Sequence, residues 1–262
     1  MGDVYVSAAV NAAKEAGKTI LMFYRKDFSG KKKADGSPLT HTDQQSHLVI
    51  SRLLEKTGIP VVSEEGSELH LNTRRYWLVD PLDGTKDFLA ANDEFTVNIA
   101  LIDEESPVLG VLYAPALDEL YVGMQGEAVF QECRGVKTMC RTSPKNYRLR
   151  MAVSRFHDHP DSEIFAKMNC VEERIPIGAA LKYGRLAMGE IDVYPRLVGT
   201  SEWDTAAGQA VLEAAGGRIL DWNTGGALRY GKPRRRNGRL LAFRAPYLAE
   251  DFKLITYEKE CS

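Results

Sequence analysis

Six short β-rich runs follow one another between residues 59 and 133, and this row of strands most restricts the possible folds. The runs are IPVVSEE, RYWLVDP, EFTVNIALID, VLGVLYAP, ELYVGM and AVFQEC, several of them joined by compact turns. Closely spaced strands pair with their sequence neighbours, so we expect a meandering antiparallel sheet. With 262 residues, of which 44% are hydrophobic, the chain is long enough to bury such a sheet in a large core.

Two amphipathic helices are predicted before this row of strands. Residues 4–23 place apolar and small side chains on one helical face, namely Val6, Ala9, Val10, Ala13, Ala16, Gly17 and Ile20. Residues 42–54 form the second predicted helix, with Asp43 near its first turn and with Leu48, Leu53 and Leu54 facing inward.

The pattern changes after CRTSPKNY, where strands and helices alternate. The predicted order is strand RLRMAVS, a helix near residues 161–169, helix ALKYGRLAMG, strand IDVYPR, helix DTAAGQAVLEAAGG, and strands GRILDW and GRLLAFRA. We therefore expect two linked halves, an N-terminal α+β domain of residues 1–145 and a C-terminal α/β domain of residues 146–262.

Composition excludes several classes of protein. A net charge of −2 gives no sign of a general polyanion binder, and the basic runs at 31–33 and 232–236 lack interleaved aromatics, so we interpret both as solvated loops and expect no nucleic-acid partner. The four cysteines form no CxxC pair, which disfavours a disulfide framework or a zinc site. No signal peptide or stretch of eighteen apolar residues is present, and we expect a cytoplasmic protein.

The stretch WLVDPLDGTKDF, residues 77–88, places two aspartates three positions apart. A buried strand would deliver Asp80, the following proline would force a turn, and Asp83 would precede a helix that starts at Gly84-Thr85. Two converging carboxylates and the carbonyl of Leu82 suit a hard divalent cation, and the N–H groups of Gly84-Thr85 would receive a phosphate. Alternatively Asp83 is an ordinary N-cap and Asp80 a turn residue.

Two further acidic positions bear on this choice. The strand VVSEEGS ends in Glu64-Glu65, whose adjacent carboxylates repel each other unless they are solvated or bound to cations. Asp204 begins the alanine-rich segment DTAAGQAVLEAAGG, where capping alone would also explain an aspartate.

Taken together, SEE, WLVDPLDGTKDF with EFTVNIALI, and EWDTAAGQAVLEAAGG resemble the three signatures of the inositol monophosphatase superfamily of magnesium-dependent, lithium-sensitive phosphatases. Within it, KADGSPLTHTD, SRFH and ALKYGRLAMGEIDVYPR are most similar to the 3'(2'),5'-bisphosphate nucleotidases of the CysQ type, which convert adenosine 3',5'-bisphosphate to AMP and phosphate. The resemblance implies a layered α-β-α-β-α sandwich of the inositol monophosphatase and fructose-1,6-bisphosphatase type. In it the first half would hold most metal ligands, and the second the substrate-binding residues.

The resemblance also implies roles for particular residues. The implied Mg²⁺ ligands, for two or three ions, are Glu64, Asp80, Asp83, Asp204 and the carbonyl of Leu82. The residues implied to act on the attacking water are Asp43 and Thr85, with Glu64 also serving catalysis. The implied substrate contacts are Gly84, Thr85, Ser154, His157, Gly178, Lys182 and Asp204. The chain departs from the usual SRSH and GSSLK patterns, with Phe156, Ala179 and Ala180 in place of serines.

The implied reaction is direct attack by metal-activated water on a small phosphorylated substrate, and the implied enzyme is a monomer or a homodimer. Some relatives associate with the inner membrane surface, although nothing in this sequence requires it. The nearest alternative is a sugar phosphatase of the same superfamily, acting on inositol monophosphate or fructose 1,6-bisphosphate. A haloacid-dehalogenase-type phosphatase is disfavoured because its nucleophile loop has one residue between its aspartates, whereas this chain has two. A non-catalytic phospholigand-binding protein is disfavoured because every matching carboxylate is present.

Overall fold

The computed structural model describes residues 2–25, 38–66, 73–127, 129–140, 144–146 and 148–255. Two long helices come first, α1 (Gly2–Phe23) and α2 (Pro38–Leu54), and they pack against each other. The buried face of α1 is largely alanine, as its spacing predicted. The inward orientation predicted for Leu48 was wrong, because this residue is 57% exposed. The buried stripe of α2 instead recurs every four residues, at Thr42, Ser46, Ile50 and Leu54.

A seven-stranded sheet follows, with its strands in sequence order. The strands are β1 (Val61–Ser63), β2 (Tyr76–Asp83), β3 (Thr96–Asp103), β4 (Ser106–Ala114), β5 (Glu119–Met124), β6 (Phe130–Cys133) and β7 (Val136–Met139). From β2 to β7 the pairing is antiparallel, which confirms the predicted meander. The edge pair differs from the prediction, because β1 runs parallel to β2.

A second sheet has five strands in the order β12-β14-β10-β8-β9. These strands are β8 (Leu149–Ser154), β9 (Val171–Ile177), β10 (Val193–Arg196), β12 (Arg218–Asp221) and β14 (Leu240–Phe243). Strand β8 pairs parallel with both β9 and β10, whereas β14 pairs antiparallel with β10 and β12. Two short strands, β11 (Thr200–Ser201) and β13 (Arg236–Asn237), form a separate antiparallel pair.

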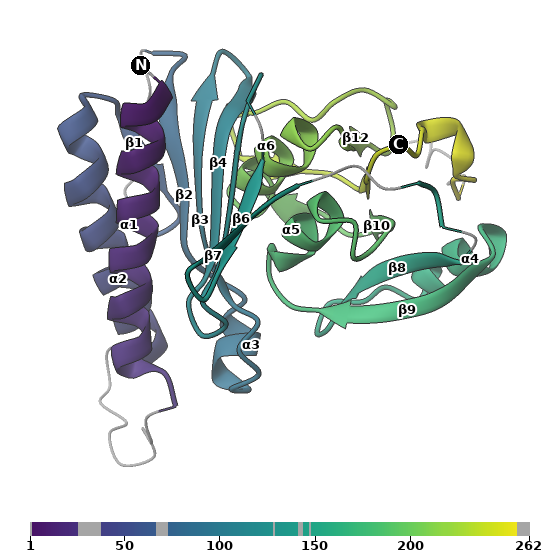
Figure 1. Cartoon of the computed structure of the whole chain (residues 1–262), viewed down its shortest axis with the longest axis horizontal. Coiled ribbons are helices and arrows are strands. Elements are labelled where there is room, and N and C mark those ends of the chain that lie inside the picture. The colour runs from purple at the N-terminus through teal and green to yellow at the C-terminus, as the bar shows by residue number, and fades with distance from the viewer. Residues whose placement is uncertain are drawn as a thin grey trace.

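Helices cover both sheets and separate them, as Figure 1 shows. Helices α1 and α2 lie on the outer face of the first sheet, and α5 (Leu181–Ala187) and α6 (Ala206–Ala214) lie between the two sheets. The shorter helices are α3 (Thr85–Leu89), α4 (Asp161–Met168) and the 3-10 turns Glu55–Thr57 and Ala249–Asp251. This succession of layers is the α-β-α-β-α sandwich that the sequence predicted.

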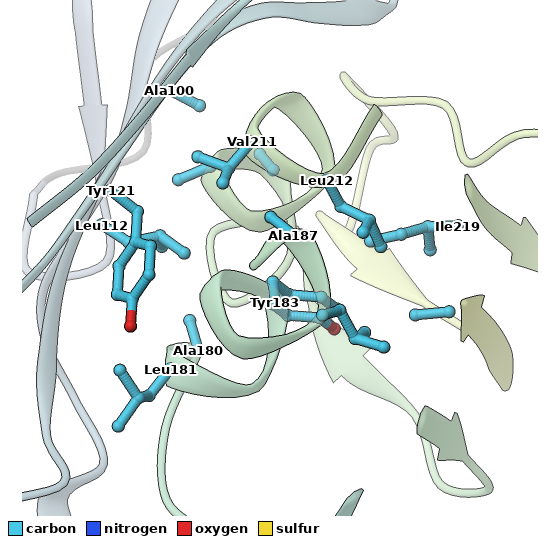
Figure 2. Close-up of a cluster of buried hydrophobic side chains, with 14 of the residues drawn as sticks. Ala100, Leu112, Tyr121, Ala180, Leu181, Tyr183, Ala187, Val211, Leu212 and Ile219 are labelled. Carbon is cyan, nitrogen blue, oxygen red and sulfur yellow. The ribbon is translucent and has the colours of Figure 1, made fainter. Parts of the chain in front are cut away.

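The middle layer packs unusually close to the first sheet. A Cβ added to Gly110 of β4 would lie 2.2 Å from the Ala207 carbonyl oxygen, so the backbone of α6 rests directly on the strand. A Cβ added to Gly208 would lie 2.2 Å from the ring of Tyr183 on α5. Figure 2 shows Leu112 and Tyr121 of the first sheet pointing toward these helices. The small residues therefore fix the separation of the helix and the sheet.

The boundary near residue 145 remains a proposal, and it falls between β7, which ends at Met139, and β8, which begins at Leu149. In the described ranges the cysteines Cys133, Cys140 and Cys170 are free thiols, and Cys261 lies outside these ranges. No helix within the described residues has the length and apolar character needed to span a membrane.

Candidate active site

The end of β2 brings two aspartates to the inner edge of the first sheet. Asp80 is 2% exposed and accepts a hydrogen bond from the Leu82 N–H at 3.1 Å. The sequence predicted a turn at Pro81, whereas β2 continues to Asp83 through an irregular register against β3. The Pro81 carbonyl accepts a hydrogen bond from Ser46 of α2 at 2.8 Å, which holds this irregular segment in place.

Asp83 is half-buried where β2 meets α3. Its carboxylate accepts hydrogen bonds from the side chain of Asn98 at 3.1 Å and from the Ala180 N–H, so it is held from both halves of the chain. The next residue, Gly84, has a φ of 85°, a conformation that favours glycine, and α3 begins at Thr85 as predicted.

The other two predicted ligands come from separate segments. Glu64 follows directly after β1 and is exposed to solvent. Asp204 lies between β11 and α6, where its carboxylate accepts hydrogen bonds from the Thr200 hydroxyl and from the Ser201 N–H. Asp204 therefore holds the β11 turn as well as facing the site, and it does not cap α6, whose N-cap is Thr205.

These carboxylates share one cavity of about 350 Å³. Its walls include Glu64, Asp80, Leu82, Asp83, Gly84, Thr85 and Asp204. Burial and the neighbouring carboxylates raise the pKa of Asp80 well above its ordinary value. Burial, and then Asp204, raise the pKa of Asp83 to about 6. For Glu64, partial desolvation of the carboxyl group by the cavity wall, and then Asp204, raise the pKa to about 7. Although Glu64 is exposed to solvent, it is thus crowded by negative charge.

The donor set fits a hard divalent cation, because every candidate ligand is an oxygen. In the described part of the chain, no three acidic, histidine or cysteine side chains have the mutual spacing of a complete metal-binding group. The carboxylates of Glu64, Asp80, Asp83 and Asp204 face one cavity, which Asp87 also lines, and they repel one another. A cation between them would remove that repulsion and lower their pKa values. The metal-ligand prediction rests on this chemistry and on the shared cavity.

Basic side chains line the same cavity. Its lining includes Lys86, His157, Lys182 and Arg196. Burial and the charges of Lys86, Arg196 and Lys182 lower the pKa of His157, so this imidazole is neutral at pH 7. Arg196 is half-buried at the end of β10 and carries a charge that does not titrate. One cavity therefore combines a carboxylate cluster with a cationic cluster.

Lys182 is held more tightly than its sequence context suggested. It is 5% exposed, and its ammonium group donates to the carbonyl oxygens of Ile177 at 2.8 Å and Ala179 at 2.6 Å. Burial lowers its pKa to about 8. These bonds fix the turn between β9 and α5, so direct binding of a phosphate by Lys182 would compete with two existing hydrogen bonds.

The predicted substrate residues are not all brought together. Ser154 and His157 line the cavity, and the Ser154 hydroxyl accepts a hydrogen bond from the His157 N–H at 3.2 Å. Gly178 is not among the described lining residues, and its N–H donates to Glu94 at 2.7 Å. An added Cβ at Gly178 would lie 2.5 Å from the Glu94 carbonyl oxygen, so close packing explains the glycine.

The two residues predicted to act on water lie in different elements. Thr85 lines the cavity, whereas Asp43 lies on α2, beyond its first turn, and is not part of the described lining. Burial and the charge of Glu65 raise the pKa of Asp43 to about 7. The charge of Asp43 also acts on Glu64, which places it beside the acidic cluster. No hydrogen bond joins Asp43 to Thr85 in the described structure.

Sequence reasoning did not single out Arg196, Lys86 or Tyr194, although all three line the cavity. A usable signal existed for Arg196, because an arginine at the end of a buried strand, in DVYPR, lies where side chains reach the edge of a sheet. Lys86 directly follows Thr85 in the first signature and gave no separate signal.

The chain belongs to the inositol monophosphatase family, whose sequence model matches residues 2–251. It is similar to proteins named 3'(2'),5'-bisphosphate nucleotidase CysQ. It is 42% identical to that of Shigella flexneri over 217 residues, which are 80% of this chain and 87% of the relative. It is 39% identical to that of Buchnera aphidicola over 226 residues, which are 83% of this chain and 84% of the relative.

Solved structures of inositol monophosphatase family members are also similar to this chain. The crystal structure of CysQ from Bacteroides thetaiotaomicron has a TM-score of 0.84 and 35% identity, covering 91% of this chain and 96% of that one. An inositol monophosphatase from Zymomonas mobilis has a TM-score of 0.75 and 26% identity, covering 91% of each chain. The resemblance and the fold class predicted from the sequence are thereby confirmed.

Proposed function

We propose that this chain is a magnesium-dependent 3'(2'),5'-bisphosphate nucleotidase that removes the 3'-phosphate of adenosine 3',5'-bisphosphate and yields AMP and phosphate. The observation that carries the proposal is a single cavity lined by five carboxylates, the four proposed metal ligands and Asp87, and by cationic side chains. A bisphosphate needs both, because one phosphate reacts beside metal ions and the other has to be held away from them. The names of the relatives at 39% and 42% identity, 3'(2'),5'-bisphosphate nucleotidase CysQ, support the same activity.

The proposed metal ligands are Glu64, Asp80, Asp83, Asp204 and the carbonyl of Leu82. When bound, Mg²⁺ would supply the charge that makes water a better nucleophile and that offsets the charge of the phosphate. The aspartates contribute rigidity, since Asp80, Asp83 and Asp204 are each held by hydrogen bonds from neighbouring backbone N–H groups. We propose two or three ions, and inhibition by Li⁺.

The reacting phosphate would be positioned by the start of α3. The N–H groups of Gly84 and Thr85 precede the first complete turn and lack intrahelical acceptors, so they are available to phosphoryl oxygens. The Thr85 hydroxyl would orient the attacking water, and Asp43, whose pKa burial and Glu65 raise to about 7, would accept its proton at neutral pH. Glu64 would serve catalysis from the same acidic cluster.

The second phosphate would be bound mainly by Arg196, because its guanidinium offers several donors and stays charged. Lys182 would act chiefly through the turn that its two carbonyl contacts hold, and Gly178 by allowing that turn to pack on Glu94. Ser154 and His157 would contact the nucleoside. We propose that the enzyme acts as a monomer or homodimer.

A substrate panel tests the proposal. Phosphate release would be measured from adenosine 3',5'-bisphosphate, 3'-AMP, inositol 1-phosphate and fructose 1,6-bisphosphate, in Mg²⁺, in Mg²⁺ with Li⁺, and in EDTA. We expect the highest kcat/KM with adenosine 3',5'-bisphosphate, and activity that depends on Mg²⁺ and falls with Li⁺. A higher kcat/KM with inositol 1-phosphate or fructose 1,6-bisphosphate would make the chain a sugar phosphatase instead. Absence of turnover with all four substrates would favour a binding protein.

A further inference from the structure

A second cavity, of about 830 Å³, lies on the other side of Glu64. Its walls come from β1 and the residues after it, from Tyr76 at the start of β2, from the turn Glu104-Glu105 between β3 and β4, from Trp203, and from the segment 229–235. Glu64 is the one described residue that lines both this cavity and the catalytic one. The volume of this second cavity is in the range of small-molecule binding sites.

Unpartnered polar atoms converge on this cavity. Across the described residues, three buried side-chain nitrogen or oxygen atoms lack a hydrogen bond of regular geometry, namely the Tyr76 hydroxyl, the Trp203 Nε1 and the Arg235 Nη1, which lies 3.9 Å from a carboxylate oxygen of Glu202. The Arg235 guanidinium also lies over the Tyr76 ring, 5.6 Å from its centroid. All three residues line the second cavity, and Tyr76 is only 3% exposed. Burial and the charge of Glu202 raise the pKa of Tyr76 to about 12, so its hydroxyl keeps its proton. Each of the three atoms is thus a hydrogen-bond donor, and buried donors are normally paired.

Basic side chains of the lining are concentrated in one segment. Segment 229–235 contributes Arg229, Lys232, Arg234 and Arg235 to the wall. Lys232 is paired with the fully buried Glu202 at 2.9 Å, and Arg235 lies 3.9 Å from the same carboxylate. Arg229 donates to the Ser106 hydroxyl, and Arg234 has no carboxylate partner in the described ranges. On the opposite wall Glu104 is paired with Arg74 at 2.6 Å, which leaves Glu64 and Glu105 as the acidic groups.

We propose that this second cavity is a binding site for a small phosphate-bearing anion, separate from the site of hydrolysis. The anion would accept hydrogen bonds from Tyr76 and Trp203 and would be attracted by Arg229, Arg234 and Arg235. The site does not require the proposed nucleotidase activity, because none of these five residues lines the catalytic cavity. An anion bound in the second cavity would nevertheless affect the catalytic carboxylates, because Glu64 lines both cavities and Trp203 directly precedes Asp204.

The test is calorimetric titration of the full chain with inorganic pyrophosphate in EDTA. Without divalent cations the catalytic carboxylates repel the anion, so binding reports on the second cavity. We expect one saturable site, accompanied by a change in tryptophan fluorescence that Trp203→Phe removes. Loss of the charge-assisted bond in Tyr76→Phe should weaken binding about 10- to 100-fold. Arg234→Gln, which changes an exposed side chain, should weaken it about two- to fivefold.

The matched control is Arg196→Gln, which removes a cation from the catalytic cavity and should leave pyrophosphate affinity unchanged. If Tyr76→Phe and Arg234→Gln both bind like the wild type, the proposal is overturned, and so it is if the wild type shows no saturable binding at millimolar pyrophosphate. Loss of binding in Arg196→Gln alone would place the anion in the catalytic cavity and would equally reject a second site. None of these results depends on turnover, so they are separate from a failure of the nucleotidase assay.

Discussion

Asp83→Asn should stabilise the metal-free protein while abolishing hydrolysis. Burial and the charge of Asp204 raise the pKa of Asp83 from 3.8 to about 6. The folded protein therefore holds a proton that the unfolded chain has already released. The free energy of unfolding falls as the pH rises from 3.8 to about 6, and it stays lower at higher pH. The asparagine removes this penalty because it cannot ionise.

The size of the effect follows from the same shift. A change from 3.8 to about 6 corresponds to about 3 kcal/mol at 1.36 kcal/mol per pKa unit. The side chain is partly exposed, so solvent screening reduces this figure. The amide also loses one of the hydrogen bonds that Asn98 and Ala180 donate, which costs about 1 kcal/mol. We expect a net gain of about 1 kcal/mol at pH 7.5 and almost none at pH 4.

Urea unfolding in EDTA at these two pH values is the assay, with phosphate release in Mg²⁺ as the functional measurement. Glu127→Gln is the matched control, because it neutralises an exposed carboxylate in a turn and should change neither quantity. A variant less stable than the wild type at pH 7.5, or a gain of equal size at both pH values, would refute the electrostatic reasoning. Near-normal turnover at saturating Mg²⁺ would refute the assignment of Asp83 as a metal ligand.

Four further substitutions test the cavity and the packing. Thr85→Ala should lower kcat about 10²- to 10⁴-fold with little change in KM, and a rise in KM alone would show that Thr85 only binds substrate. Arg196→Gln should lower kcat/KM about 10- to 100-fold for adenosine 3',5'-bisphosphate but only slightly for 3'-AMP, whereas equal losses would mean that Arg196 contacts the reacting phosphate. Lys182→Met should lower both activities and the melting temperature together, and a loss confined to the bisphosphate would instead make Lys182 a direct phosphate ligand. Gly110→Ala should cost about 1–3 kcal/mol of stability in thermal unfolding, and a cost no larger than that of Gly226→Ala would show that α6 moves away freely.

Most of the first sheet was predictable because its strands are apolar and adjacent in sequence. The parallel pairing of β1 was not, since it depends on where the chain returns after the segment that joins β1 to β2. Strand β9 was missed because VEERIPI carries three consecutive charged residues, and the structure leaves these exposed while the backbone pairs with β8. Strand β7 is exposed along its whole length and gives no apolar alternation.

The candidate site was predictable to the extent that its residues lie within three positions of a strand end or a helix start. Asp80, Asp83 and Asp204 have recognisable local patterns, and the structure brings them into one cavity. The carbonyl contacts of Lys182 and the bond from Gly178 to Glu94 could not be predicted. The second of these joins positions 84 residues apart, and such a contact leaves no periodic signal in the sequence.

The close approach of α6 to β4 would bear on which ion the proposed metal site selects. Gly110 and the Ala207 carbonyl meet without an intervening flexible side chain, so backbone atoms set the spacing between this helix and the sheet. Asp204 precedes α6 by two residues, and Asp80 and Asp83 belong to the sheet. Mg²⁺ requires oxygen ligands at about 2.0–2.1 Å, and Ca²⁺ accepts about 2.3–2.6 Å. We expect the discrimination between these ionic radii to be governed by a glycine and a carbonyl group that touch neither ion.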